Sequence, residues 1–341
     1  MRALFLTAYG DPDVLQMRDA PDPTPGAGEV RVTVHAAGVN FADIQARVRL
    51  YPDAPKAPCV LGYEVAGVVE SVGVGVDASL VGTRVMAPTR FGGFAELAVA
   101  KAADLIPLPA STSFEEGAAI PVVYGTAYGA ICKYGNVEEG EVVVIHAAAG
   151  GVGTAAIQLA KDRGATIIGT ASKAKHERLR EMGVEHTIDY RTEDVEARIR
   201  AISGGKGVDV ILDARAGSGF KESYRLLRAG GRLVIYGANE MVSGEKMNPL
   251  RVAKVWFQTP RFDGLDLMQS SRSVIGLNML KVWDDQGSLA SLAKPIAKLL
   301  ERGVIKPVLG EVFPIEKAAD AHRYIQDRKN VGKVVLRVRT S

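Results

Sequence analysis

The sequence holds one glycine-rich turn that stands between an apolar run and a stretch with helical spacing. The apolar run covers residues 142–146, the turn reads His-Ala-Ala-Ala-Gly-Gly-Val-Gly over 146–153, and the helical spacing covers 151–163. The N–H groups that begin a helix have no acceptor within it, and the helix dipole adds a partial positive charge there. Gly150 lets the backbone approach a ligand, and Gly153 lets the helix pack closely on the strand. This combination predicts a site for the pyrophosphate of a dinucleotide.

The turn departs from the usual G-x-G-x-x-G spacing, because Ala148 stands at the position of the first glycine. A string of this kind is weak evidence by itself, and a tight turn with only a structural role is the alternative. The strand before the turn, the helix after it and a further strand over 166–170 together favour the dinucleotide site.

The residues after that further strand indicate which dinucleotide binds. NAD sites place Asp or Glu about 20 residues beyond the glycines, where it holds the ribose 2′-hydroxyl. Residues 169–176 read Gly-Thr-Ala-Ser-Lys-Ala-Lys-His, with no carboxylate. Ser172 and Lys175 can donate hydrogen bonds to a 2′-phosphate, and Tyr190 can add a hydroxyl or flank the adenosine. We therefore predict NADPH as the cofactor, against the alternative of ordinary solvated lysines at an exposed helix start.

Histidine and cysteine side chains are too scattered to form a zinc site. The chain has five histidines and two cysteines, and no C-x-x-C or H-x-x-x-H pair occurs. We therefore predict no metal. His146 ends a buried strand, which favours a structural histidine over a ligand. No Ser-His-Asp or Cys-His arrangement indicates hydrolysis.

Strand and helix signals divide the chain near residue 113. Before it, short strand patterns punctuated by Gly and Pro predict a barrel-like domain. Ser113 and Glu116 then form a capping box, and strands alternate with helices beyond it. The alternation predicts a doubly wound parallel sheet. The predicted strands cover 30–34, 64–72, 84–87, 94–99, 142–146, 166–170, 208–212, 232–236, 273–277 and 333–338, and the predicted helices 40–47, 122–134, 151–163, 176–182 and 220–227.

Two later segments read less clearly. Residues 239–271 predict an irregular segment that carries Trp256 and Phe257. A helical stretch over 288–302 contains Pro295, which we expect to interrupt and kink it.

Composition bounds the class of protein. A chain of 341 residues favours two domains. The net charge of +3 is spread without a long basic run, so nucleic acid is not indicated. Only two cysteines, Cys59 and Cys132, fit a reducing compartment, and no apolar run approaches the ~20 residues of a membrane span. The sequence therefore predicts a cytoplasmic protein.

The whole chain resembles the medium-chain dehydrogenase/reductase superfamily, in particular its zinc-free quinone oxidoreductase (zeta-crystallin-like) branch. The vesicle amine transport protein subgroup is the most similar. The stretches that carry the resemblance are Gly38–Asp43, Leu50–Pro52, Gly62–Gly67, Gly82–Val85, the turn at 146–153, Gly169–Ser172, Ile188–Tyr190 and Lys329–Leu336. Zinc-dependent relatives carry Cys at the place of Phe41 or Ala42, and His at the place of Tyr63.

The resemblance implies an architecture and an assembly. It implies a GroES-like β-barrel catalytic domain over 1–121, completed by 282–341, and a Rossmann NADPH-binding domain over 122–281. It also implies a homodimer formed through the strand 273–277. The expected substrate is a small molecule, a quinone or an activated C=C bond of an enone, which receives hydride from NADPH.

The resemblance also implies cofactor contacts residue by residue. Asn40 and Thr126 would lie near the nicotinamide, Ser172, Lys175 and Tyr190 would hold the 2′-phosphate, and a further group would hold the pyrophosphate or line the cleft. That further group comprises Ala149, Gly150, Gly151, Val152, Gly153, Gly237, Asn239, Leu277 and Asn330.

Without a metal, hydrogen-bond donors must stabilise the oxygen that gains charge during hydride transfer. Asn40 and Tyr51 are candidates, with Tyr63 behind them. The alternatives are that Asn40 only caps the helix it begins and that the two tyrosines are structural aromatics. Asp43 is expected to be a structural helix residue.

Two other functions stay open. An enoyl-thioester reductase would need a long channel and a basic mouth, which Arg47 and Arg49 would furnish; the alternative is that they are ordinary arginines on a solvated helix. A structural or regulatory NADPH-binding protein would use the insertion 241–272 to contact a partner or a membrane surface; the favoured alternative is that this insertion belongs to the dimer interface. Aromatic residues lie beside basic ones there: Trp256, Phe257 and Phe262 beside Arg251, Lys254 and Arg261.

Overall fold

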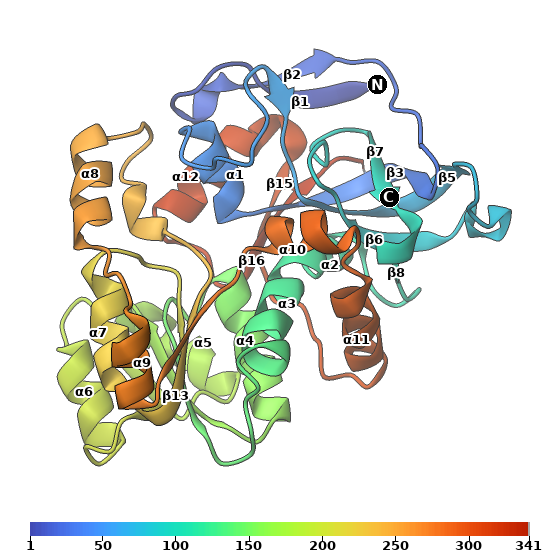
Figure 1. The fold of residues 1–341 in the computed structure, drawn as a ribbon. Helices are drawn as coiled ribbons and strands as arrows, with labels where there is room; N and C mark the ends of the chain where they lie inside the picture. The colour runs from blue at the N-terminus through green and yellow to red at the C-terminus, as the bar shows by residue number, and fades with distance from the viewer. Residues whose placement is uncertain (340–341) are drawn as a thin grey trace. The chain divides into compact units, whose positions relative to one another are not determined.

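The computed structural model describes residues 1–339, which form two compact units (Figure 1). Unit 1 comprises Met1–Gly125, Val242–Met247 and the chain from Met279 onward; unit 2 comprises Thr126–Met241 and Asn248–Asn278. None of the described helices is long and apolar enough to cross a bilayer.

Unit 2 is built on a six-stranded sheet whose five strand pairings are all parallel. The strand order is β11-β10-β9-β12-β13-β14, the arrangement of a doubly wound dinucleotide-binding fold. The predicted α/β fold is thus confirmed. Buried β-branched side chains explain why these segments become central strands, since both faces of the sheet are covered. The strands are β9 (Val142–Ile145), β10 (Thr166–Ala171), β11 (His186–Asp189), β12 (Val208–Asp213), β13 (Leu227–Ile235) and β14 (Ser273–Gly276).

Six helices belong to unit 2, and two of them correct the sequence analysis. The segment 239–271, predicted to be irregular, contains α8 and α9. Asn248 caps α8 by accepting the Arg251 N–H at 3.1 Å, and Pro249 occupies the first helical position. The helix was missed because much of its apolar surface faces solvent, so its periodicity does not mark a core. The helices are α4 (Gly151–Asp162), α5 (His176–Glu181), α6 (Val195–Ile202), α7 (Ser218–Leu226), α8 (Pro249–Gln258) and α9 (Gly264–Ser270).

Unit 1 consists mainly of short antiparallel strands. Its seven-stranded sheet has the order β15-β16-β3-β5-β6-β8, with β7 also paired to β3, and a smaller sheet has the order β2-β1-β4. Bulges in the β3–β5 pairing bend the larger sheet around an apolar core. The strands are β1 (Arg2–Leu6), β2 (Leu15–Asp19), β3 (Glu29–Val39), β4 (Cys59–Val60), β5 (Glu64–Val72), β6 (Arg84–Pro88), β7 (Leu97–Lys101), β8 (Ile106–Pro107), β15 (Leu309–Pro314) and β16 (Lys333–Arg337).

The predicted strand over 94–99 begins three residues too early. Phe94 donates its backbone N–H to Leu61 and accepts that of Leu4, and Ala95 forms an isolated bridge with Ala3. These contacts hold 94–95 against β1, so pairing with β3 starts only at Leu97.

The helices of unit 1 are α1 (Phe41–Arg47), α2 (Phe114–Gly117), α10 (Met279–Gln286), α11 (Ala290–Glu301) and α12 (Ala318–Gln326). The expected capping box of Ser113 and Glu116 is present. Pro295 does not interrupt α11, which runs through it as one element. The helix predicted over 122–134 is α3 (Pro121–Tyr128), which the two units share, followed by a π-helical turn closed by the Tyr134 N–H and Gly129 O.

Arg47 is buried, which corrects its placement on a solvated helix face. Its guanidinium donates to the carbonyl oxygens of Gly10 and Glu245, to Gln326 Oε1 at 2.7 Å and to His322 Nδ1 at 3.3 Å. It thereby ties α1, α12 and the segment 242–247 together within unit 1. All of these acceptors belong to unit 1 itself, so the Arg47 side chain has a structural role.

Candidate active site

The glycine turn follows β9 in the centre of the unit 2 sheet, where the strand order reverses between β9 and β12. Ligands of doubly wound folds bind at this point. The turn is tight, with Ala147 at φ 52° and the Gly150 N–H donating to Ala147 O at 2.9 Å. A Cβ atom on Gly153 would lie 2.5 Å from Ala148 O and 2.6 Å from Ala147 O. Only glycine therefore allows α4 to start this close to the turn.

Gly150 precedes the first residue of α4, and no side chain caps this helix end. The N–H groups of the first helical turn have no acceptors within a helix, and the dipole makes this end positive. The start of α4, with the close turn before it, therefore suits a diphosphate as the acceptor of these N–H groups better than a capping side chain.

The other unit 2 residues predicted to bind cofactor gather at the same sheet edge. They follow the carboxyl ends of strands that all run parallel, and the pairing Ala171↔Asp189 sets the ends of β10 and β11 level. The residues are Ser172 and Lys175 after β10, Tyr190 after β11, Gly237 and Asn239 after β13, and Leu277 after β14. Thr126 lies apart from this edge in sequence, within α3, and Asn40 and Asn330 belong to unit 1.

His146 lies buried at the base of the glycine turn. Its Nδ1 contacts Thr170 Oγ1 at 3.2 Å, its Nε2 contacts Ser223 Oγ at 3.2 Å, and Arg215 Nη2 is 3.3 Å from Nε2. Burial, reinforced by the positive charge of Arg215, lowers the pKa of His146 to about 4. These contacts are those of a neutral, structural histidine. No local sequence signal indicates that Arg215 is its neighbour.

In unit 1, Asn40 joins a buried ionic cluster. It ends β3 and begins α1, and its side-chain oxygen accepts from Lys333 Nζ while its Nδ2 donates to Glu64 Oε1 at 2.9 Å. Lys333 and Glu64 also form an ion pair at 2.6 Å, with both side chains buried. Glu64 Oε2 accepts the Val122 N–H at 2.7 Å. Because a lysine only donates, it fixes which end of the Asn40 amide faces which partner.

Asp43 completes this cluster and is fully buried. Its carboxylate accepts the Asn40 N–H at 2.8 Å and the Gly62 N–H at 3.1 Å, so it caps α1 as a structural residue. Burial raises its pKa to about 7, against the lowering effect of these hydrogen bonds and of Lys333. The sequence analysis missed Glu64 and Lys333; the signal was a charged residue at the start of each strand, directly before a run of apolar residues.

Tyr51 and Tyr63 lie side by side in unit 1. Their ring centroids are 6.0 Å apart with an edge-to-face angle of 76°, and Phe91 lies 5.3 Å from Tyr63 on the same group of rings. Burial raises the pKa of Tyr51 to about 12 and raises that of Tyr63 further. The Tyr63 hydroxyl is buried and makes no hydrogen bond within residues 1–339. A buried hydroxyl without a partner is costly, so a ligand oxygen would stabilise it.

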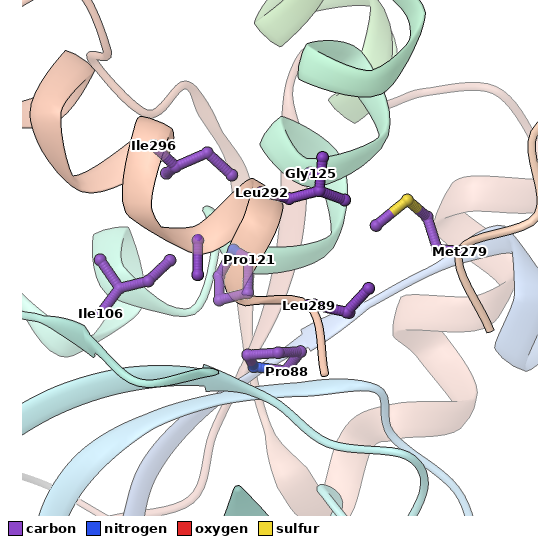
Figure 2. A pocket seen from close by; sticks show the side chains of 9 residues that line it. Pro88, Ile106, Pro121, Gly125, Met279, Leu289, Leu292 and Ile296 are labelled. Carbon is purple, nitrogen blue, oxygen red and sulfur yellow. The ribbon is translucent and has the colours of Figure 1, made fainter. Parts of the chain in front are cut away.

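A separate crevice in unit 1 is unsuited to catalysis. Figure 2 shows it between α11 and the ends of β6 and β8. None of the predicted site residues lines it, and its lining has no polar side chain that could orient a substrate. The lining residues are Pro88, Ile106, Pro121, Gly125, Met279, Leu289, Leu292, Ala293 and Ile296.

Comparison with known proteins identifies the family. Residues 26–110 match the domain family described as alcohol dehydrogenase GroES-like domain, and residues 151–289 match zinc-binding dehydrogenase. The chain is 40% identical over 339 residues to the synaptic vesicle membrane protein VAT-1 homolog of Rattus norvegicus, covering 98% of this chain and 84% of that protein. The chain belongs to the medium-chain dehydrogenase/reductase family.

Further members place it in the quinone oxidoreductase-like branch of this family of oxidoreductases. The quinone oxidoreductase of Rattus norvegicus is 32% identical over 340 residues, covering 98% of this chain and 97% of that protein. The crystal structure of Escherichia coli quinone oxidoreductase complexed with NADPH aligns with a TM-score of 0.85 at 30% identity, over 99% of this chain and all of that one. The family matched by residues 151–289 is described as zinc-binding. Within residues 1–339, however, no group of three or more His, Cys, Asp or Glu side chains is arranged to hold a metal ion.

The depressed pKa of His146 predicts a dependence of stability on pH. Between about pH 6.5 and pH 4 the unfolded chain binds a proton at this histidine and the folded chain does not, so the unfolding free energy falls as pH falls. One such proton contributes a slope of about 1.4 kcal/mol per pH unit. Urea unfolding of His146→Gln, measured from pH 6.5 down to pH 4.5, should show a slope smaller by about 1 kcal/mol per unit than wild type. Identical slopes would show that His146 is protonated as readily in the fold as in the unfolded chain.

Proposed function

We propose that this chain is an NADPH-dependent reductase that delivers hydride to a quinone or to the activated C=C bond of an enone. The nicotinamide supplies the hydride, and the protein supplies binding, orientation and electrostatic stabilisation. The observation that carries the proposal is the fit of Gly153 beneath the turn, which leaves the start of α4 open to a diphosphate.

The end of β10 supports the choice of a phosphorylated dinucleotide. Ser172 follows β10 with a hydroxyl, and the exposed Lys173 and the half-buried Lys175 come after it. One carboxylate, Asp189, stands at the end of the neighbouring strand. It accepts the Arg191 N–H at 3.0 Å and the Thr192 hydroxyl at 3.1 Å, and these bonds lower its pKa.

Asp189 thus accepts hydrogen bonds from its own loop, and Lys173 and Arg191 are exposed. Arg191 lies 5.9 Å from the Tyr190 ring and adds a positive charge that the sequence analysis did not consider. We propose that Ser172, Lys175 and Tyr190 hold the 2′-phosphate and that Ala149–Gly153 hold the diphosphate.

On the substrate side, the aromatic group of unit 1 suits a flat, electron-poor ring. Aromatic faces and edges pack favourably against such rings. The raised pKa values keep both phenols protonated, so the Tyr63 O–H can donate to an oxygen that gains negative charge, with Tyr51 beside it. We assign Asn40 a place near the nicotinamide; its amide is oriented by Lys333 and Glu64, so its role is to position rather than to move a proton.

The remaining assignments are proposals of the same kind. Thr126, Gly237, Asn239, Leu277 and Asn330 line the rest of the cofactor cleft. The protein is cytoplasmic and forms a homodimer by pairing the outer edge of β14 with its copy, since β14 ends the sheet of unit 2.

The sequence argument for the enoyl-thioester alternative is weakened, because Arg47 is buried among carbonyl oxygens and cannot recognise an anionic carrier, and only Arg49 of the two is exposed. The non-catalytic alternative is separated from a reductase by assay. Purified protein and NADPH are mixed with a panel of quinones, enones and crotonyl thioesters, and the loss of NADPH absorbance is followed. A reductase oxidises NADPH with a quinone or an enone; tight NADPH binding without turnover on any compound would favour the structural or regulatory protein.

The aromatic group makes a prediction for that assay. Tyr63→Phe removes only the hydroxyl, and we expect kcat with the best quinone or enone to fall about 100-fold while NADPH binding is kept. An unchanged kcat would remove Tyr63 from the reaction.

The cofactor assignment makes a second prediction. Lys175→Glu replaces a donor to the 2′-phosphate with a repelling charge, so the Kd for NADPH should rise on the order of 100-fold while that for NADH stays near its wild-type value. The control is Lys206→Glu, which changes an exposed charge just before β12, at the opposite edge of the sheet. Equal effects of Lys175→Glu on both cofactors, or an equal effect of the control, would contradict the assignment.

A further inference from the structure

Helix α8 exposes apolar side chains that the fold does not use. Phe257 is 86% exposed, Leu250 83% and Trp256 65%. Leu250, Ala253, Lys254 and Phe257 are spaced at i, i+3, i+4 and i+7, so they form one stripe along the helix, and all four are exposed. An amphipathic helix normally turns such a stripe toward a core. Here the stripe faces outward, and Trp256 extends it sideways.

The opposite side of α8 holds the helix on unit 2. Val255 is buried against Ala216 and Phe220, and Arg251 Nε donates to Glu240 O at 2.6 Å. The Thr259 hydroxyl accepts the Gly217 N–H at 3.1 Å, just beyond the helix end. The exposed stripe is therefore presented from a helix packed and hydrogen-bonded from behind.

Within residues 248–262 the charged side chains all have one sign. Residues 248–262 contain Arg251, Lys254 and Arg261 and no carboxylate. Lys254 lies within the stripe, and Arg261 is exposed beyond the end of the helix. A partner for this surface must therefore offer an apolar layer together with negative charge.

We propose that α8 is a docking surface for a bilayer of anionic phospholipid. Leu250, Trp256 and Phe257 enter the boundary between headgroups and acyl chains, where a tryptophan ring finds both apolar and polar neighbours. Lys254 lays its apolar stem along the same layer and reaches lipid phosphates with its ammonium group. The protein then binds reversibly at the surface, in keeping with the lack of any spanning helix among residues 1–339.

A second copy of the chain fits this surface less well. Ala253 and Lys254 are at the middle of the stripe, so an isologous contact between two α8 helices would set Lys254 against its own copy. With no carboxylate in 248–262, nothing within the segment offsets that repulsion. An anionic bilayer supplies the opposite charge across the whole contact.

The test uses the full chain and sedimented vesicles, either of phosphatidylcholine alone or of phosphatidylcholine mixed with phosphatidylserine. We expect binding to the mixed vesicles at low salt, weaker binding at high salt, and little binding to phosphatidylcholine alone. The fluorescence reports the site directly. Of the two tryptophans, Trp283 is 5% exposed, so a blue shift on binding comes from Trp256. The absence of both sedimentation and a blue shift with mixed vesicles at low salt would overturn the proposal.

Matched variants locate the contact. Leu250→Glu combined with Phe257→Glu should weaken binding at least about tenfold, and Lys254→Gln about fivefold. Leu265→Glu on α9 changes an apolar side chain of similar exposure, 64%, outside the stripe, and should bind like wild type. Thermal unfolding and the circular dichroism spectrum of each variant check that unit 2 keeps its fold. Wild-type vesicle binding by the double variant, or a dimer in sedimentation velocity that the double variant alone dissociates, would contradict lipid docking.

Discussion

The site proposed in unit 2 depends on the close contact between the start of α4 and the turn before it. At Gly153 the helix lies so near the carbonyl oxygens of Ala147 and Ala148 that no side chain fits. The sheet order, the neutral His146 beneath the turn and the loops after β10 and β11 all serve this one helix end. A diphosphate is the ligand that uses it fully, since it can accept several N–H groups at once.

The distinctive feature of unit 1 is a cluster of polar and charged side chains buried inside a β-rich core. Glu64 and Lys333 neutralise one another, and Asn40 and the Val122 N–H satisfy the atoms that remain. A buried pair of this kind contributes little net stability, because the desolvation of both charges offsets their attraction. Its effect is to fix geometry, for it holds the start of α1 against β5 and β16. Tyr51 and Tyr63 belong to the same unit. Burial raises the pKa of both hydroxyls, so both stay protonated.

The sequence predicts those features of the structure that depend on neighbouring residues, and it does not predict contacts between residues far apart in the chain. The strands of unit 2 were predictable, because residues such as 142–145 form apolar runs that only a sheet covered on both faces explains. The glycine turn was predictable because the spacing of its glycines reflects the close backbone packing within the turn itself. The Glu64–Lys333 pair was not, since nothing local says which of many distant charges will meet in a core. Arg47 was misjudged for the same reason: its acceptors come from three separate segments. Helix α8 was missed because its stripe faces solvent, although Asn248 and Pro249 mark its start.

The most direct measurement of the central claim is a calorimetric titration of the wild-type chain with NADPH. The geometry at the start of α4 predicts saturable binding with one NADPH per chain, well below millimolar concentration. A flat titration up to millimolar NADPH would contradict it, and the proposed reductase function would fall with it.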